Sequence, residues 1–191
     1  MKKLAKEDID IWETSTEKYL NKIKKLCDNV DKKQIKRVIK ILERKSNKGK
    51  TIFVCGNGGS AATASHFVCD LMKTSEQPFE VVCLNDNMPL VTAIANDWGY
   101  EYIFSFQLVA LANEGDLLIV ISGSGNSDNI IEAMKWAKKM KMETVAFLGK
   151  GGGKAKGMVD ECVLVPSDEY GLIEDFHMIL VHLITDHFKN L

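Results

Sequence analysis

The sequence predicts an α/β fold: a doubly wound, five-stranded parallel sheet flanked by helices and preceded by a two-helix N-terminal extension. From residue 51 onward, short apolar runs alternate with helix-length segments, which is the pattern of βαβ units covered on both faces. Before residue 50 the apolar residues instead recur at intervals of three and four, as in amphipathic helices. We expect one domain, 1–191, made of a helical extension (1–49) and an α/β core (50–191).

The extension is expected to contain two helices that mediate oligomerisation. Asp31 should cap the second helix and Gly49 should end it. The apolar stripe of the first helix would overfill the surface of a monomer, which favours a subunit contact. Its members are Ile9, Trp12, Thr16, Tyr19, Ile23 and Leu26.

The core is expected to alternate strands and helices to its end. The predicted strands are Thr51–Cys55, Phe79–Leu84, Leu117–Ile121, Thr144–Leu148 and Cys162–Val165. The predicted helical segments are Ser60–Met72, Met88–Ala112, Ser127–Lys139 and Gly171–Phe188. In such a sheet, ligands collect beyond the carboxyl ends of the strands, where the strand-to-helix turns lie.

Composition narrows the class of protein. No apolar run approaches the ~20 residues that cross a bilayer, and the N-terminus lacks the apolar core of a signal peptide, so we expect a cytoplasmic protein without a membrane partner. Five cysteines without a CxxC pair favour reduced thiols. Residues 1–50 carry 16 Lys+Arg against 8 Asp+Glu, but the charges are interspersed, which favours a solvated helix face over nucleic-acid binding.

Two glycine-rich turns follow predicted strands. In "CGNGGSAA" (residues 55–62), glycines allow close approach of a ligand to the backbone, and the following helix N-terminus presents free N–H groups. In "SGSGNSDN" (residues 122–129), three hydroxyls lie within six residues, and Ser127 is placed as an N-cap. Hydroxyls without a neighbouring Lys or Arg suit a dianion held by neutral donors. Together the turns predict a site for a phosphate monoester.

The two turns match the known nucleotide-binding motifs less well than they match a phosphate-monoester site. The first turn has Ala61 at the last position of a GxGxxG pattern, and the acidic residue after the next strand, Asp86, follows by nearly 30 residues rather than about 20. The GK[ST] ending of a P-loop is missing from both turns.

Three stretches in order, "GNGGSAATASHF", "AIANDWGYE" and "ISGSGNSDN", resemble the signature stretches of the sugar isomerase (SIS) domain family, and within it the phosphoheptose isomerases. The similarity extends over nearly the whole chain. It implies a cytosolic homotetramer with active sites at subunit interfaces, which interconverts sedoheptulose 7-phosphate and D-glycero-D-manno-heptose 7-phosphate for lipopolysaccharide or capsule heptose synthesis. The phosphate and substrate contacts that it implies are Asn57, Gly58, Ser60, Asp97, Ser122, Gly123, Ser124 and Ser127.

Aldose–ketose interconversion through an enediol needs a base beside the carbonyl and a group that shuttles protons at the oxygens. His66 and Asp70 share a helix face, whereas Glu174 and His182 are eight residues apart, about 80° beyond two turns, and share a cleft only if it is broad or the helix bends. We expect Asp70 or Glu174 to remove the proton and His182 to act at the oxygen.

The resemblance also bears on metal binding. The family has His and Glu on the first of these helices and Gln and His on the last, and some members bind zinc through them. Here the matching residues are His66, Asp70, Glu174 and His182, so two of four differ. Two carboxylates and two imidazoles make a good divalent-metal set, so zinc is an expected cofactor.

Several alternatives remain open. His177 fits a supporting role beside the site or core packing, and Trp98 and Tyr100 fit a sugar pocket or the core. Lys73 fits a solvated charge or a phosphate contact. The altered acidic residues also keep open a non-catalytic SIS-fold protein, either a phosphosugar sensor or an adaptor that binds a replication initiator.

Overall fold

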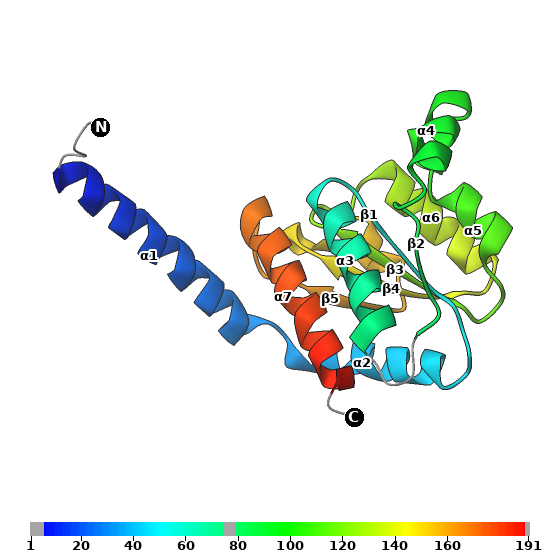
Figure 1. The fold of residues 1–191 in the computed structure, drawn as a ribbon, viewed down its shortest axis with the longest axis horizontal. Helices are drawn as coiled ribbons and strands as arrows, with labels where there is room; N and C mark the ends of the chain where they lie inside the picture. The colour runs from blue at the N-terminus through cyan, green and yellow to red at the C-terminus, as the bar shows by residue number, and fades with distance from the viewer. Residues whose placement is uncertain (1–5, 75–78, 190–191) are drawn as a thin grey trace.

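The structure, a computed structural model, describes residues 6–74 and 79–189, with side chains for residues 14–73 and 79–189. Five parallel strands form one sheet in the order β2-β1-β3-β4-β5 (Figure 1). The strands are β1 (Ile52–Gly56), β2 (Val81–Cys83), β3 (Leu117–Ser122), β4 (Glu143–Leu148) and β5 (Glu161–Leu164). The predicted doubly wound five-stranded sheet is therefore confirmed.

Alternate residues of the central strands enter two separate cores, because successive side chains of a strand point to opposite faces of the sheet. Val54, Ile119 and Phe147 pack in one core, while Phe53 and Val120 pack in the other. Strands β1 and β3 are buried along their whole length, which explains their continuous apolar runs.

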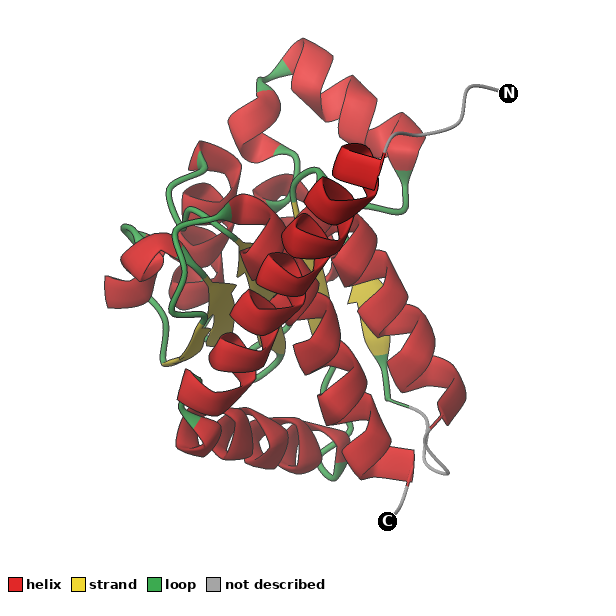
Figure 2. Cartoon of the chain, turned by 90° about the vertical axis from the view of Figure 1, so that its left-hand side faces the viewer, coloured by secondary structure: helices red, strands yellow, loops and turns green. Residues whose placement is uncertain are grey.

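Helices cover both faces of the sheet (Figures 1 and 2). One core contains residues of α2 (Lys32–Ser46), α3 (Gly59–Thr74) and α7 (Tyr170–Lys189). The other contains residues of α4 (Met88–Asp97), α5 (Ser105–Leu111) and α6 (Asp128–Lys139). Within the described residues, none of the helices is both long and apolar enough to span a bilayer.

Helix α1 (Lys6–Asn29) leaves the body of the molecule (Figure 1). Its C-terminal half touches α7 through the Tyr19 hydroxyl, which donates to Asp175 Oδ2 at 2.6 Å, and Leu26 is buried. Leu20, in contrast, is 62% exposed. The side chains of Ile9 and Trp12 lie outside the described residues, so the predicted contact stripe is seen only in part.

Most expected helix ends agree with the structure. Asp31 caps α2 and accepts a hydrogen bond from the Lys33 amide at 2.8 Å. The segment predicted as one helix from Met88 to Ala112 is instead divided, because Gly99 has φ +119° and turns the chain between α4 and a short 3₁₀ turn, Tyr100–Tyr102. That break places Tyr100 beside the glycine-rich turn after β1.

Candidate active site

The two predicted phosphate turns lie side by side, because their strands are neighbours: Gly56 of β1 is in register with Ile121 of β3. A reciprocal amide pair joins the turns. Asn57 Nδ2 donates to Asn129 Oδ1, and Asn129 Nδ2 donates to Asn57 Oδ1, both at 2.8 Å. The Tyr100 hydroxyl adds a hydrogen bond to Asn57 Oδ1 at 3.0 Å. The sequence-distant turns therefore form a single wall.

The first turn brings the chain tightly into α3. A Cβ on Gly56 would lie 2.6 Å from the Ser60 carbonyl oxygen, so only glycine fits between the strand end and the helix. The Asn85 side chain braces the same residue, since Gly56 N donates to Asn85 Oδ1 at 3.1 Å and Asn85 Nδ2 donates to Gly56 O at 2.8 Å. The N-terminal amides of α3 begin directly beyond this turn.

The second turn is shaped by its own hydroxyls. Ser122 Oγ accepts from the Gly125 amide at 3.0 Å, and Ser124 Oγ accepts from the Asn126 amide at 3.2 Å. Because each oxygen acts here as an acceptor, each O–H group can still donate to a ligand. Ser127 occupies the N-cap position of α6 as predicted, but its side chain makes no capping hydrogen bond. These hydroxyls suit an anion.

A cavity of about 120 Å³ lies between the two turns and the start of α7. Six of the eight predicted phosphate and substrate contacts line it, joined by Ile121, Tyr170 and Glu174. The six are Asn57, Ser60, Ser122, Gly123, Ser124 and Ser127. Its size suits a phosphoryl group rather than a whole sugar.

The structure places Gly58 and Asp97 outside this cavity. Gly58 lines an adjoining cleft of about 660 Å³ on the far side of the first turn, together with Asp86 and Tyr100. Asp97 is exposed at the end of α4 and accepts a hydrogen bond from Asn96 Nδ2 at 2.9 Å. A contact from Asp97 to a sugar in the same chain's cavity therefore has no support in this geometry.

His66, Asp70 and His182 form a compact cluster where α3 packs against α7. The two histidine Nε2 atoms are 2.8 Å apart, and His66 Nε2 lies 3.3 Å from Asp70 Oδ2. Asp70 is 6% exposed and also pairs with Lys73, whose Nζ lies 3.3 Å from Asp70 Oδ1. Of the expected acid–base groups, Asp70 and His182 each contact His66, whereas Glu174 lies elsewhere. Lys73 reaches Asp70 rather than the serine cavity.

This cluster fits a divalent metal by its donor set. One ligand atom from each of the three residues lies within 4.8 Å of the others, and two imidazoles with a carboxylate are a known zinc combination that leaves a position open. Glu174, the fourth predicted ligand, is not brought into the cluster. Its carboxylate instead packs against Gly59 at the start of α3.

The cluster and the serine cavity occupy two levels along the α3–α7 pair. His66 is seven residues beyond Gly59 and His182 is eight residues beyond Glu174, which at 1.5 Å per residue separates the levels by about 10–12 Å. An extended sugar phosphate has a comparable length. The arrangement can hold an ester at one level and expose its far end to the imidazoles at the other.

His177 lies in the core, which favours the packing alternative. It is fully buried beside Phe147, with 6.4 Å between ring centroids, and neither ring nitrogen has a hydrogen-bond partner among the described residues. Burial lowers the pKa of His177 to about 4, and the nearby Leu148 backbone acts in the opposite direction. The ring is therefore neutral at physiological pH.

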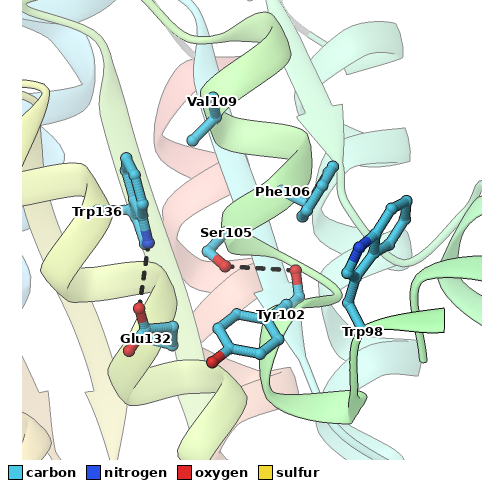
Figure 3. A pocket seen from close by; sticks show the side chains of 7 residues that line it. All are labelled: Trp98, Tyr102, Ser105, Phe106, Val109, Glu132 and Trp136. Atoms are coloured by element: carbon cyan, nitrogen blue, oxygen red, sulfur yellow. Dashed lines mark hydrogen bonds between the residues drawn. The ribbon is translucent and has the colours of Figure 1, made fainter. Parts of the chain in front are cut away.

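A second cavity, of about 470 Å³, lies between α5 and α6, beside the 3₁₀ turn and Trp98, the residue that follows α4 (Figure 3). Its lining residues are Trp98, Tyr102, Ser105, Phe106, Val109, Glu132 and Trp136. Trp98 stacks on Phe106 with 4.6 Å between centroids and is 56% exposed. Trp98 thus belongs neither to the core nor to the serine cavity, whereas Tyr100 reaches the site through Asn57.

Sequence reasoning missed two parts of the site. Asn129 was contained in the quoted second turn, but its pairing with Asn57 depends on the strand order, which a single sequence does not reveal. Tyr170, whose ring lies 3.1 Å from the position of a Cβ on Gly123, begins α7 and carries no local signal for ligand binding.

Comparison with known proteins supports the assignment that the motifs suggested. Residues 18–149 match the model of the SIS domain family. A probable phosphoheptose isomerase of Thermoplasma acidophilum is 42% identical over 156 residues, which cover 78% of this chain and 86% of the relative. A phosphoheptose isomerase of Helicobacter pylori strain P12 is 38% identical over 167 residues, covering 86% of each chain.

This chain belongs to the SIS domain family, and within it to the phosphoheptose isomerases. The structure of a phosphoheptose isomerase from Francisella tularensis superimposes with a TM-score of 0.88 at 30% identity, covering 96% of this chain and 98% of that one. The enzyme from Neisseria gonorrhoeae gives the same TM-score at 31% identity, with coverage of 95% and 100%. The likeness therefore spans the fold as well as the motifs.

Proposed function

We propose that this enzyme interconverts sedoheptulose 7-phosphate and D-glycero-D-manno-heptose 7-phosphate. The observation that carries the proposal is the pairing, on one α3–α7 surface, of a small hydroxyl-lined cavity with a carboxylate–imidazole cluster. The names of relatives at about 40% identity support the substrate class. The cavity would hold the phosphate, with the sugar chain directed along α3 toward the cluster.

In the proposed mechanism, each end of the substrate meets a different set of groups. The hydroxyls of Ser60, Ser124 and Ser127 hold the ester. The Gly59 amide adds a donor, because the Ser60 and Ala61 amides already donate to the carbonyl oxygens of Asn57 and Gly58, and α3 contributes the positive end of its dipole. Asp70 takes the proton from the carbon beside the carbonyl. When no metal is bound, His182 moves a proton between the two substrate oxygens, because an imidazole can act as donor and as acceptor.

Zinc is the proposed cofactor, held by His66, Asp70 and His182, where it would polarise the substrate oxygens. Elemental analysis of the purified enzyme, with His66→Ala as the comparison, tests this assignment. Zinc retained equally by wild type and variant would contradict it.

We also propose a cytoplasmic homotetramer with active sites at subunit interfaces. Two features support it: the exposed apolar Leu20 on the projecting helix α1, and the placement of Asp97 away from its own chain's cavity. Sedimentation equilibrium of wild type and Leu20→Glu gives the test. A monomeric wild type would overturn this part of the proposal.

A coupled assay of sedoheptulose 7-phosphate conversion, run with and without added zinc, tests the activity directly. We expect turnover of the seven-carbon substrate above that of ribulose 5-phosphate. The proposal fails if pure, folded enzyme forms no aldose product from sedoheptulose 7-phosphate under either condition.

A further inference from the structure

The Glu174 carboxylate lies where the phosphate ester is proposed to bind. A Cβ placed on Gly59 would lie 2.6 Å from Glu174 Oε2 and 2.9 Å from its carboxyl carbon, so the carboxylate packs against the first residue of α3. The Ser60 and Ala61 amides donate to the carbonyl oxygens of Asn57 and Gly58 at 3.0 Å, whereas the Gly59 amide has no acceptor among the described residues. This amide and the positive end of the helix dipole remain for an anion. Glu174 therefore places a negative charge at the helix end that the serine cavity shares.

The Glu174 carboxylate is important for ligand binding because the rest of the cavity lining that the structure describes has no charged side chain. Of the described residues that line the cavity, Glu174 alone carries a carboxylate, and the others offer hydroxyl, amide, phenol or apolar groups. Lys150 places its Nζ over the Tyr170 ring, 3.7 Å from the centroid, but it is not itself a lining residue. A dianionic ester in this cavity would face a carboxylate that no lining cation neutralises.

The carboxylate is also free to move. Glu174 is half-buried, and within the part of the chain that the structure describes no hydrogen bond or ion pair fixes its oxygens. Asp175, the next residue, is held by contrast through the Tyr19 hydroxyl at 2.6 Å. The Glu174 side chain can therefore turn away from Gly59 without breaking a hydrogen bond like the one that holds Asp175.

We propose that Glu174 is a binding-site residue that limits affinity, because its carboxylate competes with the phosphate ester for the N-terminus of α3. This inference rests on the proposed function, because it assumes that a phosphate ester is the ligand. In the empty site the enzyme's own carboxylate occupies the anion position, and the ester binds as that side chain is displaced. The competition limits how tightly the site holds phosphorylated substrate and product, and it favours release.

Removing the charge while keeping the shape of the side chain is the test. Isothermal titration calorimetry with inorganic phosphate, and separately with sedoheptulose 7-phosphate, compares wild type, Glu174→Gln and Asp175→Asn. We expect Glu174→Gln to lower both dissociation constants by about tenfold, since it removes a like charge beside the ligand. Asp175→Asn removes the same charge from the neighbouring, exposed position and should change them less than about twofold.

Two further measurements locate the effect. Addition of phosphate to Glu174→Gln should shift the amide resonances of Gly59 and Ser60, and KM should fall in parallel with the dissociation constant. Unchanged or weaker phosphate binding in Glu174→Gln, with wild type isomerising sedoheptulose 7-phosphate, overturns this inference alone. If neither protein binds phosphate and wild type forms no product, both the inference and the proposed function fail.

Discussion

The serine-lined cavity lies at Ser127, the N-cap of α6, and the aromatic cavity lies along the middle of α6, and the two are lined by chemically different groups. The serine cavity, about 120 Å³, offers hydroxyls, an amide and a helix N-terminus. The aromatic cavity, about 470 Å³, offers two tryptophans, a tyrosine and a phenylalanine around one carboxylate, Glu132, which already accepts from Trp136 Nε1 at 3.1 Å. The larger of these two cavities is therefore the more apolar one. Hydroxyl and amide donors at the strand ends, rather than volume, identify the cavity that suits an anion.

The largest effect is expected from a change in the acid–base cluster, which lies on the same helix pair as the serine cavity and not beside the aromatic cavity. Asp70→Asn should lower kcat for sedoheptulose 7-phosphate by about 10²-fold or more, because a positioned general base typically contributes that much. Steady-state kinetics of folded variant and wild type measure the loss. An adaptor without catalytic function would show no activity to lose, and full activity in Asp70→Asn would remove this residue from the mechanism.

The buried ring of His177 gives a prediction about the core beneath the serine cavity. Its folded-state pKa of about 4 lies below the ordinary value of 6.5, so the unfolded chain binds the proton more readily. Stability should therefore decline as pH falls from about 6.5 to 4, by up to about 3 kcal/mol from this group. Urea titrations at several pH values should show a flatter decline for His177→Leu, and an identical slope in the two proteins would contradict the assignment.

The amide pair that joins the two turns has no counterpart in the aromatic cavity. Asn57→Ala leaves Asn129, which is 1% exposed, with an unpaired side-chain NH₂ group, and should cost about 1–3 kcal/mol of unfolding free energy. Denaturant melts measure it. Asn96→Ala, at an exposed position, is the control and should stay within about 0.5 kcal/mol. Equal effects would show that the turns are held together by other contacts.

The mildest test compares one hydroxyl from each cavity. Ser127→Ala removes a donor without removing a capping hydrogen bond, so it should raise KM by roughly tenfold with little change in stability. Ser105→Ala, in the aromatic cavity, removes a hydrogen bond to the Tyr102 carbonyl and should leave KM within about twofold. A larger effect from Ser105 would reverse the roles of the two cavities.

Local sequence patterns made the fold and the two glycine-rich turns predictable. Apolar runs that are buried on both faces mark the strands of a parallel sheet, and glycines next to hydroxyls mark the turns, so β1, β3 and six cavity residues followed from short stretches. The division of the segment from Met88 to Ala112 was missed, although Gly99 lay in it, because its helix-forming residues continue on both sides.

The rest of the site depends on contacts between distant elements. The 80° offset indicated that Glu174 and His182 do not share a narrow cleft, and in the structure they lie at two levels of α7. The position of Glu174 against Gly59 depends on how α7 packs on α3, which the periodicity of either helix alone does not reveal. The same packing decides that His177 points into the core.

Helix α1 has a consequence for the behaviour of the chain in solution. At 1.5 Å per residue its 24 residues extend about 36 Å, much of it away from the globular body (Figure 1). A lone chain would experience the drag of an elongated particle and scatter X-rays accordingly, with a long tail in its pair-distance distribution. If this tail becomes smaller at higher protein concentration, neighbouring copies of the chain fill the space around α1.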